Sequence, residues 1–368
     1  MQPRTFDRVF LGATIVLVVV GFIVFTSASL GLLARPNEAS FAVIAFKQAF
    51  LGIGLGSLAL LIMLHINFRV LQKYAFYIFV VSLGLTALVF VPGVGFSSGG
   101  AARWIHLGSL SWQPAEFLKL AYVLYLAAIL ASARTKVRES RYGILPFAII
   151  TALVSILMLL QPDTGTFIII STAGLAMLFS AGIRFRDALI IMVAGILVLG
   201  MLAYSRLYVR DRIMTFLDPS RDPQGSSYQL QQSLIAIGSG GFSGRGLGQS
   251  VQKFKYLPEP IGDSVFAVAA EEFGFIGGVF LIGLFLFLGL RGLRIASQTP
   301  NVYGGLVCVG VVILILSQSF VNIASMMGVL PLTGVPMLFV SHGGTAMFFA
   351  LAEIGIILNI SRYRRINA

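Results

Sequence analysis

The chain has 368 residues, of which 57% are hydrophobic and only 11% are charged, and its mean hydropathy is +0.93. These values exceed what a soluble domain tolerates, so they exclude a soluble enzyme. The net charge of +12 could suggest nucleic acid, but the basic residues lie at the ends of apolar segments and in one loop. We therefore expect no nucleic-acid partner and predict an all-α, polytopic membrane protein.

Apolar runs of bilayer length predict about ten transmembrane helices in a single membrane domain, residues 1–368. The expected spans cover residues 10–33, 43–65, 74–93, 114–132, 143–161, 165–182, 187–205, 264–290, 303–326 and 338–360. Only a Pro/Gly turn at residues 161–165 separates the fifth and sixth runs, and reading them as one span would give nine. One large polar loop, residues 206–263, lies between spans seven and eight.

The distribution of Lys and Arg predicts the orientation of these spans. With ten spans and a cytoplasmic N-terminus, fifteen basic residues lie inside, three lie in short outer loops and seven lie in the long loop, while Lys119 lies within a span. Short loops dominate the positive-inside rule, so this bias favours both termini in the cytoplasm. The large loop and Asp263 are then extracytoplasmic.

Charged residues inside or beside the apolar runs are the candidate functional residues. Each costs a few kcal/mol in a membrane unless it faces the protein interior or a wet cavity. They are Glu116, Lys119, Asp163, Asp263, Glu271, Glu272 and Glu353.

Two of these candidates form a pair, because Glu116 and Lys119 lie three residues apart on one helical face. The pair is either a structural ion pair or a substrate contact. Arg103 precedes Trp104 in a segment that reads as an interfacial loop, with Trp104 and Trp112 at headgroup depth. Arg103 either snorkels to the membrane surface or binds a phosphate.

Asp163 and Asp263 each precede an expected helix, so an N-cap is the simple interpretation of both. For Asp163, capping is the preferred interpretation. For Asp263, the polar loop around it favours a functional role. Adjacent acids cannot share one helical face, so of Glu271 and Glu272 we expect one to pair with a basic or hydroxyl group and the other to reach a second cavity or carry a proton.

Two further segments attract attention. His342, beside Gly343 and Gly344, predicts an unwound or re-entrant segment that lines a cavity. The glycine-rich stretch 235–248 lacks the Lys-Ser/Thr ending of a nucleotide-binding loop. We expect its glycines to let backbone N–H groups approach an anionic or sugar head group.

A set of collinear motifs, running from the third span to the C-terminus, resembles one known family. The motifs are Arg103-Trp104, residues 113–119 (QPAEFLK), 161–166 (QPDTGT), 217–219 (LDP), 232–241 (QSLIAIGSGG), 244–248 (GRGLG), 257–259 (LPE) with Asp263, 270–272 (AEE) and 330–336 (LPLTGVP). They are similar to those of the SEDS family, the shape, elongation, division and sporulation proteins typified by FtsW, RodA and SpoVE. The residues near 91–104 lean toward FtsW, without separating a division from an elongation or sporulation member.

The resemblance implies a bacterial peptidoglycan glycosyltransferase that polymerises lipid II on the outer side of the cytoplasmic membrane, with a class B penicillin-binding protein as partner. It also implies that Asp263 is the essential acid and that Arg103, Glu116, Lys119 and Asp163 line its cavity. The chain departs from the family in having Ile261-Gly262 before the aspartate, where His-Thr is common, and His342 where a tyrosine is usual.

The residues fit this chemistry. Asp263 can accept the proton of a sugar 4-hydroxyl as that oxygen attacks the anomeric carbon of a second lipid-linked sugar. Arg103, Lys119, Arg210 and Arg212 are candidates for binding the departing pyrophosphate. Mg²⁺ or another divalent cation is the expected cofactor, with Asp263 as its candidate ligand, although the sequence shows no metal-binding cluster. A lipid II flippase and a non-catalytic scaffold of a cell-wall synthase remain the alternatives.

Overall fold

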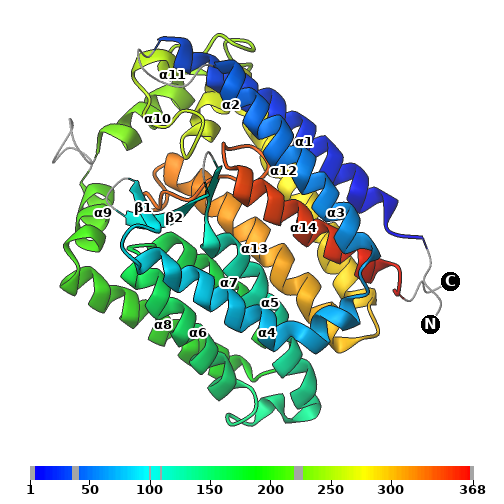
Figure 1. Cartoon of the computed structure of the whole chain (residues 1–368). Coiled ribbons are helices and arrows are strands. Elements are labelled where there is room, and N and C mark those ends of the chain that lie inside the picture. The colour runs from blue at the N-terminus through cyan, green and yellow to red at the C-terminus, as the bar shows by residue number, and fades with distance from the viewer. Residues whose placement is uncertain (1–4, 35–40, 99–100, 108–109, 219–226, 365–368) are drawn as a thin grey trace.

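The computed structural model describes residues 5–34, 41–98, 101–107, 110–218 and 227–364. Over these ranges the chain is a bundle of apolar helices (Figure 1). Eight helical segments are long and apolar enough to cross a membrane, and two shorter apolar helices accompany them. Large apolar side chains cover the outside of this bundle, as expected for helices that face lipid. The chain is therefore a multi-pass membrane protein.

The N-terminal half supplies the first seven apolar segments. They are α1 (Arg8–Ser29, followed by η1, Leu30–Ala34), the continuous run α2 (Phe41–Lys47), η2 (Gln48–Gly54) and α3 (Leu55–His65), then α4 (Phe68–Ala87, followed by η3, Leu88–Phe90), α5 (Pro114–Ala133, followed by η4, Arg134–Arg138), α6 (Ile144–Leu160), α7 (Thr164–Ser180) and α8 (Phe185–Ser205). Residues 144–180 thus form two helices that pack against each other, and the alternative of one long span is wrong.

The C-terminal half completes the bundle. The large loop contains three helices, α9 (Leu207–Leu217), α10 (Tyr228–Ser239) and α11 (Gln252–Lys255), and it is followed by α12 (Val265–Gln298), α13 (Val302–Met326) and α14 (Gly344–Ser361). Residues 327–343 are non-helical, as the unwound segment predicted around His342 requires. α13 lies at the centre, in contact with α5, α7, α12 and α14.

The structure differs from the predicted spans at several boundaries. α4 begins six residues earlier than expected, because the Asn67 side chain caps it by accepting a hydrogen bond from the Arg69 N–H at 3.0 Å. The expected interfacial loop after the third span contains a three-stranded antiparallel sheet, β1 (Gly95–Ser98), β2 (Ala101–Leu107) and β3 (Leu110–Trp112), in the order β1-β2-β3. Gly274, with φ 65°, interrupts α12 and separates its first turns from the long apolar part.

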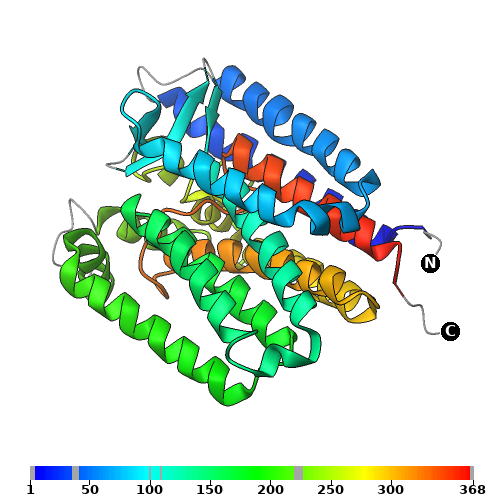
Figure 2. The ribbon, with the colours of Figure 1, turned by 60° about the horizontal axis from the view of Figure 1, so that its bottom comes forward.

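The bundle has two distinct ends. The sheet, α10 and α11 lie at one end, which we call the loop end, and both chain termini lie at the other, which we call the terminal end (Figure 1). Figure 2 shows α6–α8 on one side of the bundle and α1–α4 on the other. At the terminal end, Asp7 caps α1 and forms ion pairs with Arg291, at 2.8 Å, and with Arg364. This cluster joins the two termini.

Candidate functional site

Asp263 ends a tight turn that enters α12 at the loop end. The turn is held by a hydrogen bond from the Ser264 N–H to the Glu259 carbonyl at 3.1 Å. Asn322 of α13 donates its side-chain amide to the carbonyls of Asp263 and Val335, both at 2.8 Å. Ser264 occupies the N-cap position of α12. The backbone at Asp263 is therefore fixed in place, and the Asp263 carboxylate does not serve as the helix cap.

Arg212 of α9 faces this carboxylate across Gly334. An atom placed at the Cβ position of Gly334 would lie 3.4 Å from Arg212 Nη2 and 3.5 Å from Asp263 Oδ2, and Gly334 has φ 68°. The Arg212 guanidinium stacks on the Tyr208 ring at 4.3 Å. Its Nη1 atom is buried and has no hydrogen-bond partner within the described ranges. A buried cationic donor without a partner is suited to an anionic ligand.

Arg103 and Asp163 form the other side of the same group. Arg103, on β2, donates from Nε to the Gln161 carbonyl at 3.3 Å and from Nη2 to the Pro162 carbonyl. Its Nε lies 3.9 Å from the buried Asp163 carboxylate. Asp163 also caps α7, because it accepts hydrogen bonds from the Thr166 N–H and hydroxyl. The predicted cap is confirmed, and Arg103 is partly buried against the turn between α6 and α7 rather than extended into solvent.

Burial decides the electrostatics of the group. The pKa of Asp263 is raised from its ordinary 3.8 to about 6, mainly by burial and also by the nearby Glu259, while Arg212 and Arg103 act in the opposite direction. Burial likewise lowers the pKa of Arg212. The result is a carboxylate that is more basic than an ordinary aspartate and still ionised at neutral pH, with two arginines beside it.

A second charged group lies within the helices. Lys119 Nζ is 2.8 Å from the Glu116 carboxylate and also donates to the Gln318 side chain of α13. Glu353 of α14 is buried and interacts electrostatically with both charges. Gln318 in turn donates to the Pro336 carbonyl at 3.1 Å. The chain segment 333–336 thus connects this inner ion pair to the Asp263 group, because Asn322 binds the adjacent carbonyl.

Glu271 and Glu272 lie apart from Asp263, against the large loop. Glu272 accepts hydrogen bonds from Lys253 Nζ at 2.6 Å and from the Ser27 hydroxyl of α1 at 2.6 Å. Glu271 accepts from the Ser250 hydroxyl at 2.5 Å and from the Val251 N–H at 3.0 Å. Both glutamate side chains are buried. Both glutamates therefore find partners in the loop, and they attach it to α1 and α12.

The glycine-rich segment serves a different purpose from the one expected. The Arg245 and Gly246 N–H groups donate to the carbonyls of Glu271 and Glu272 at 3.0 and 2.9 Å. A Cβ atom on Gly244, which has φ 81°, would lie 2.1 Å from the Glu272 carbonyl oxygen. These glycines let the loop backbone pack directly on the interrupted start of α12, so the expectation that they approach an anionic head group is wrong for these N–H groups.

Two predicted site residues point elsewhere. Arg210 is exposed, and because it lies two positions from Arg212 on α9 it projects from a different face of that helix. His342 is close to the Asp263 turn through its backbone, which donates to the Ile261 carbonyl at 2.6 Å. Its ring, however, stacks on the Phe25 ring, with 6.0 Å between the two ring centroids.

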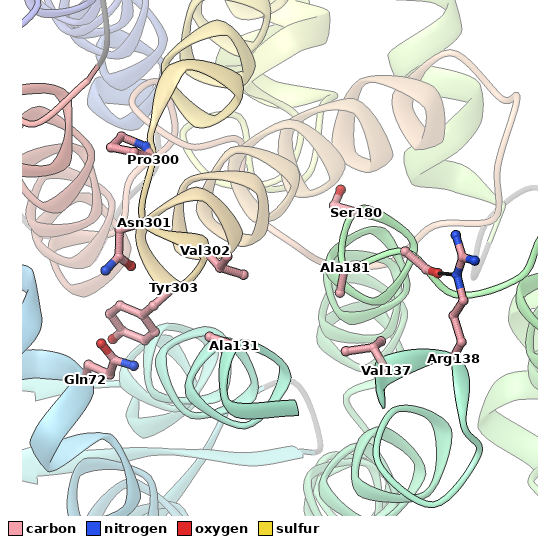
Figure 3. A pocket seen from close by; sticks show the side chains of 11 residues that line it. Gln72, Ala131, Val137, Arg138, Ser180, Ala181, Pro300, Asn301, Val302 and Tyr303 are labelled. Carbon is pink, nitrogen blue, oxygen red and sulfur yellow. Dashed lines mark hydrogen bonds between the residues drawn. The ribbon is translucent and has the colours of Figure 1, made fainter. Parts of the chain in front are cut away.

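A large pocket lies far from Asp263. It measures about 950 Å³ and is lined at the terminal end by residues such as Gln72, Arg138 and Tyr303 (Figure 3). Tyr303 begins α13, whereas Asn322, which holds the Asp263 turn, is close to its end, so the helical rise separates the two sites by about 30 Å. None of the predicted site residues lines this pocket.

Sequence inspection missed the amides that organise the site. Gln318 and Asn322 lie four residues apart on α13 and bind the carbonyls of the 335–336 segment. Two amides at helical spacing within an apolar span are a recognisable signal, because each buried amide requires hydrogen-bond partners. Lys253 was also missed, because its position in the polar loop gave no sign that its side chain is fully buried.

Bilayer-length helices with acids and arginines gathered at one end define a polytopic membrane protein with a polar site at the membrane boundary. The family model described as "Cell cycle protein", which covers FtsW, RodA and SpoVE, matches residues 7–366. The chain belongs to this family.

Individual relatives match along nearly the whole chain. Stage V sporulation protein E of Bacillus subtilis (strain 168) is 36% identical over 359 residues, 98% of each chain. A probable peptidoglycan glycosyltransferase FtsW of Geobacter sp. (strain M18) is 33% identical, also over 98% of each.

Solved structures give the same picture. A chain of a peptidoglycan synthase complex described for its coordination of polymerization and crosslinking has a TM-score of 0.82 and 29% identity, over 98% of this chain and 99% of that one. The rod shape determining protein RodA of Thermus thermophilus has a TM-score of 0.71 and 28% identity, over 98% of each chain. The all-α polytopic fold is therefore that of the family.

Proposed function

We propose that the chain is a peptidoglycan glycosyltransferase that polymerises lipid II into glycan strands. The observation that carries this proposal is the proximity of a basic carboxylate, Asp263, to Arg212, whose buried Nη1 has no hydrogen-bond partner among the described residues. One group accepts a proton and the other attracts a phosphate. The family membership and the names of the FtsW relatives support the same activity.

Asp263 acts as the general base. In the transfer, the 4-hydroxyl oxygen of the acceptor sugar forms a bond to the anomeric carbon of the donor, and the bond from that carbon to the pyrophosphate oxygen breaks. The hydroxyl proton passes to the Asp263 carboxylate, and the electron pair leaves with the pyrophosphate. A single displacement inverts the anomeric centre, so the reaction needs one carboxylate and not the paired acids of a glycosidase.

Arg212 and Arg103 bind the pyrophosphate. Charge accumulates on this leaving group in the transition state, and cationic donors held in a partly dry site stabilise it more than water does. Arg212 is already stacked on Tyr208, and Arg103 is held by two carbonyls, so neither side chain must be ordered when the substrate arrives. Lys119 and Glu116 support this group from within the bundle through Gln318.

A divalent cation such as Mg²⁺ fits this site only together with the substrate. Within the described residues, no three His, Cys, Asp or Glu side chains converge on one point. Mg²⁺ prefers few protein ligands and several phosphate or water oxygens. Asp263 is the side chain placed to hold it beside a bound pyrophosphate, and the cation would neutralise phosphate charge there.

The protein works in the bacterial cytoplasmic membrane, with both termini in the cytoplasm and the loop end outside. The excess of Lys and Arg in the short connections at the terminal end supports this orientation. A class B penicillin-binding protein is the proposed partner, because the matched solved complex is a peptidoglycan synthase that couples polymerization to crosslinking.

The test is polymerisation of lipid II by the purified protein in detergent, with and without a cognate penicillin-binding protein. We expect glycan strands from the native chain and none from Asp263→Asn. A flippase makes no glycan in detergent, and a scaffold tolerates the substitution with no change in synthesis by its partner. Either of those results would reject the assignment.

A further inference from the structure

Gly334 lies between the Asp263 carboxylate and the Arg212 guanidinium. An atom at its Cβ position would lie 3.4 Å from Arg212 Nη2 and 3.5 Å from Asp263 Oδ2, and no other atom of the described residues would lie within 4 Å of it. The Oδ2 and Nη2 atoms are therefore at most about 7 Å apart, and the two side chains form no ion pair with each other. The missing side chain of Gly334 leaves a gap between them.

The backbone that carries Gly334 is held from two sides. The side-chain nitrogen of Asn322 donates to the Val335 carbonyl and to the Asp263 carbonyl, both at 2.8 Å, so it ties this segment to the Asp263 turn. On another side the segment packs closely against α7, because a Cβ atom on Gly165 would lie 2.3 Å from Val335 Cγ2. A side chain added to Gly334 would therefore extend into the gap instead of moving the backbone away from Asp263.

The proposed reaction needs a gap of about this width. In an in-line displacement, the attacking oxygen comes to about 3 to 3.5 Å from the anomeric carbon while the leaving oxygen is still bonded on the other side, so the two oxygens lie roughly 5 Å apart. A base and a phosphate-binding donor that contact these oxygens from one side, each at about 2.8 Å, then lie about 7 Å apart. The separation of Asp263 Oδ2 and Arg212 Nη2 is compatible with this arrangement.

We propose that Gly334 admits the reacting atoms of the two sugars. The inference rests on the proposed function. With the acceptor hydroxyl at Asp263 and the departing phosphate oxygen at Arg212, the anomeric carbon lies against the Cα atom of Gly334, in space that any side chain would occupy. A methyl group at this position would touch Asp263 and Arg212 at ordinary van der Waals distances. It would thus be compatible with the folded protein and would exclude the substrate.

Gly328, near the other end of the same non-helical segment, provides a matched control. Its φ is 69°, against 68° for Gly334, so a residue with a side chain meets similar backbone strain at both positions. A Cβ atom on Gly328 would lie 3.6 Å from Leu230 and 3.8 Å from Leu234, which are again ordinary contacts. The two glycines therefore differ in what their missing side chains leave open.

The test introduces alanine and asparagine at each glycine, because asparagine adopts this left-handed backbone more readily than alanine. Glycan formation from lipid II and thermal unfolding are measured in detergent. We expect Gly334→Ala and Gly334→Asn to lower kcat/KM by about a hundredfold or more, because the reacting atoms are displaced. Gly328→Ala and Gly328→Asn should keep kcat/KM within about twofold. Each variant at position 334 should unfold at the same temperature as its counterpart at position 328.

Three results overturn the inference. One is native kcat/KM in either variant of Gly334. The second is an equal loss of kcat/KM in the matching variants of Gly328, and the third is a lower unfolding temperature for both variants of Gly334 than for those of Gly328, which would make the effect structural. If the native chain polymerises lipid II and the variants of Gly334 do so equally well, the role of Gly334 is wrong and the proposed function stands. If the native chain makes no glycan, the proposed function itself fails.

Discussion

The pH dependence of glycan synthesis follows directly from the environment of Asp263. A general base acts only when it is deprotonated, and burial raises the pKa of Asp263 to about 6. With that pKa, about nine-tenths of the carboxylates are ionised at pH 7 and about one-tenth at pH 5. We therefore expect kcat/KM for polymerisation, which reports the substrate-free protein, to fall about tenfold between pH 7 and pH 5.

The measurement is the rate of glycan formation at lipid II concentrations well below saturation across this pH range, in detergent solution at constant ionic strength. Arg210→Ala is the control. Arg210 is exposed and projects from another face of α9, so this substitution leaves the groups around Asp263 unchanged. An aspartate with its ordinary pKa of 3.8 would stay almost fully ionised at pH 5. A rate that does not change between pH 7 and pH 5 would therefore refute the assignment of Asp263 as a buried base.

The same pKa makes a prediction about stability. The folded-state pKa lies above the unfolded value, so the contribution of Asp263 to stability is fully present below about pH 4 and is lost as pH rises through 6. At pH 7 the ionised carboxylate thus opposes folding, by roughly 1 to 3 kcal/mol once its partial exposure is allowed for. Asp263→Asn should unfold at a higher temperature than the native chain at pH 7, while making no glycan.

Three further outcomes are expected. Arg212→Lys should lower the maximal rate at least tenfold, because lysine loses the planar stacking on Tyr208 and the two-pronged contact with phosphate, and Arg210→Lys should change it little. Lys253→Met should lower the free energy of unfolding by about 3 to 5 kcal/mol, measured by thermal unfolding in detergent, because it leaves the buried Glu272 without its cation. Removal of divalent cations with EDTA should slow polymerisation and Mg²⁺ should restore it, whereas an undiminished rate in EDTA would count against a cation bound at Asp263.

The sequence by itself determined the class of protein and most of its helices. Apolar runs of bilayer length can satisfy their backbone groups only as helices, so length and hydropathy were enough to find them. Asp163 as a helix cap and Glu116 with Lys119 as an ion pair were also predictable, because both depend on neighbours three residues apart along the chain. Where polar residues began a helix, as at Asn67, apolar length alone misplaced the boundary.

Only the tertiary structure decided which distant residues meet. Arg212 faces Asp263 while Arg210 does not, and this depends on how α9 is rotated, which hydropathy does not encode. The glycines near Gly244 allow two backbones to pack, although their pattern is equally compatible with anion binding. Lys47 and the start of α14 line one pocket, although they lie near opposite ends of the chain. Hydrophobic periodicity reflects contacts along one helix, whereas a site built from several helices and a strand depends on packing between segments far apart in the chain.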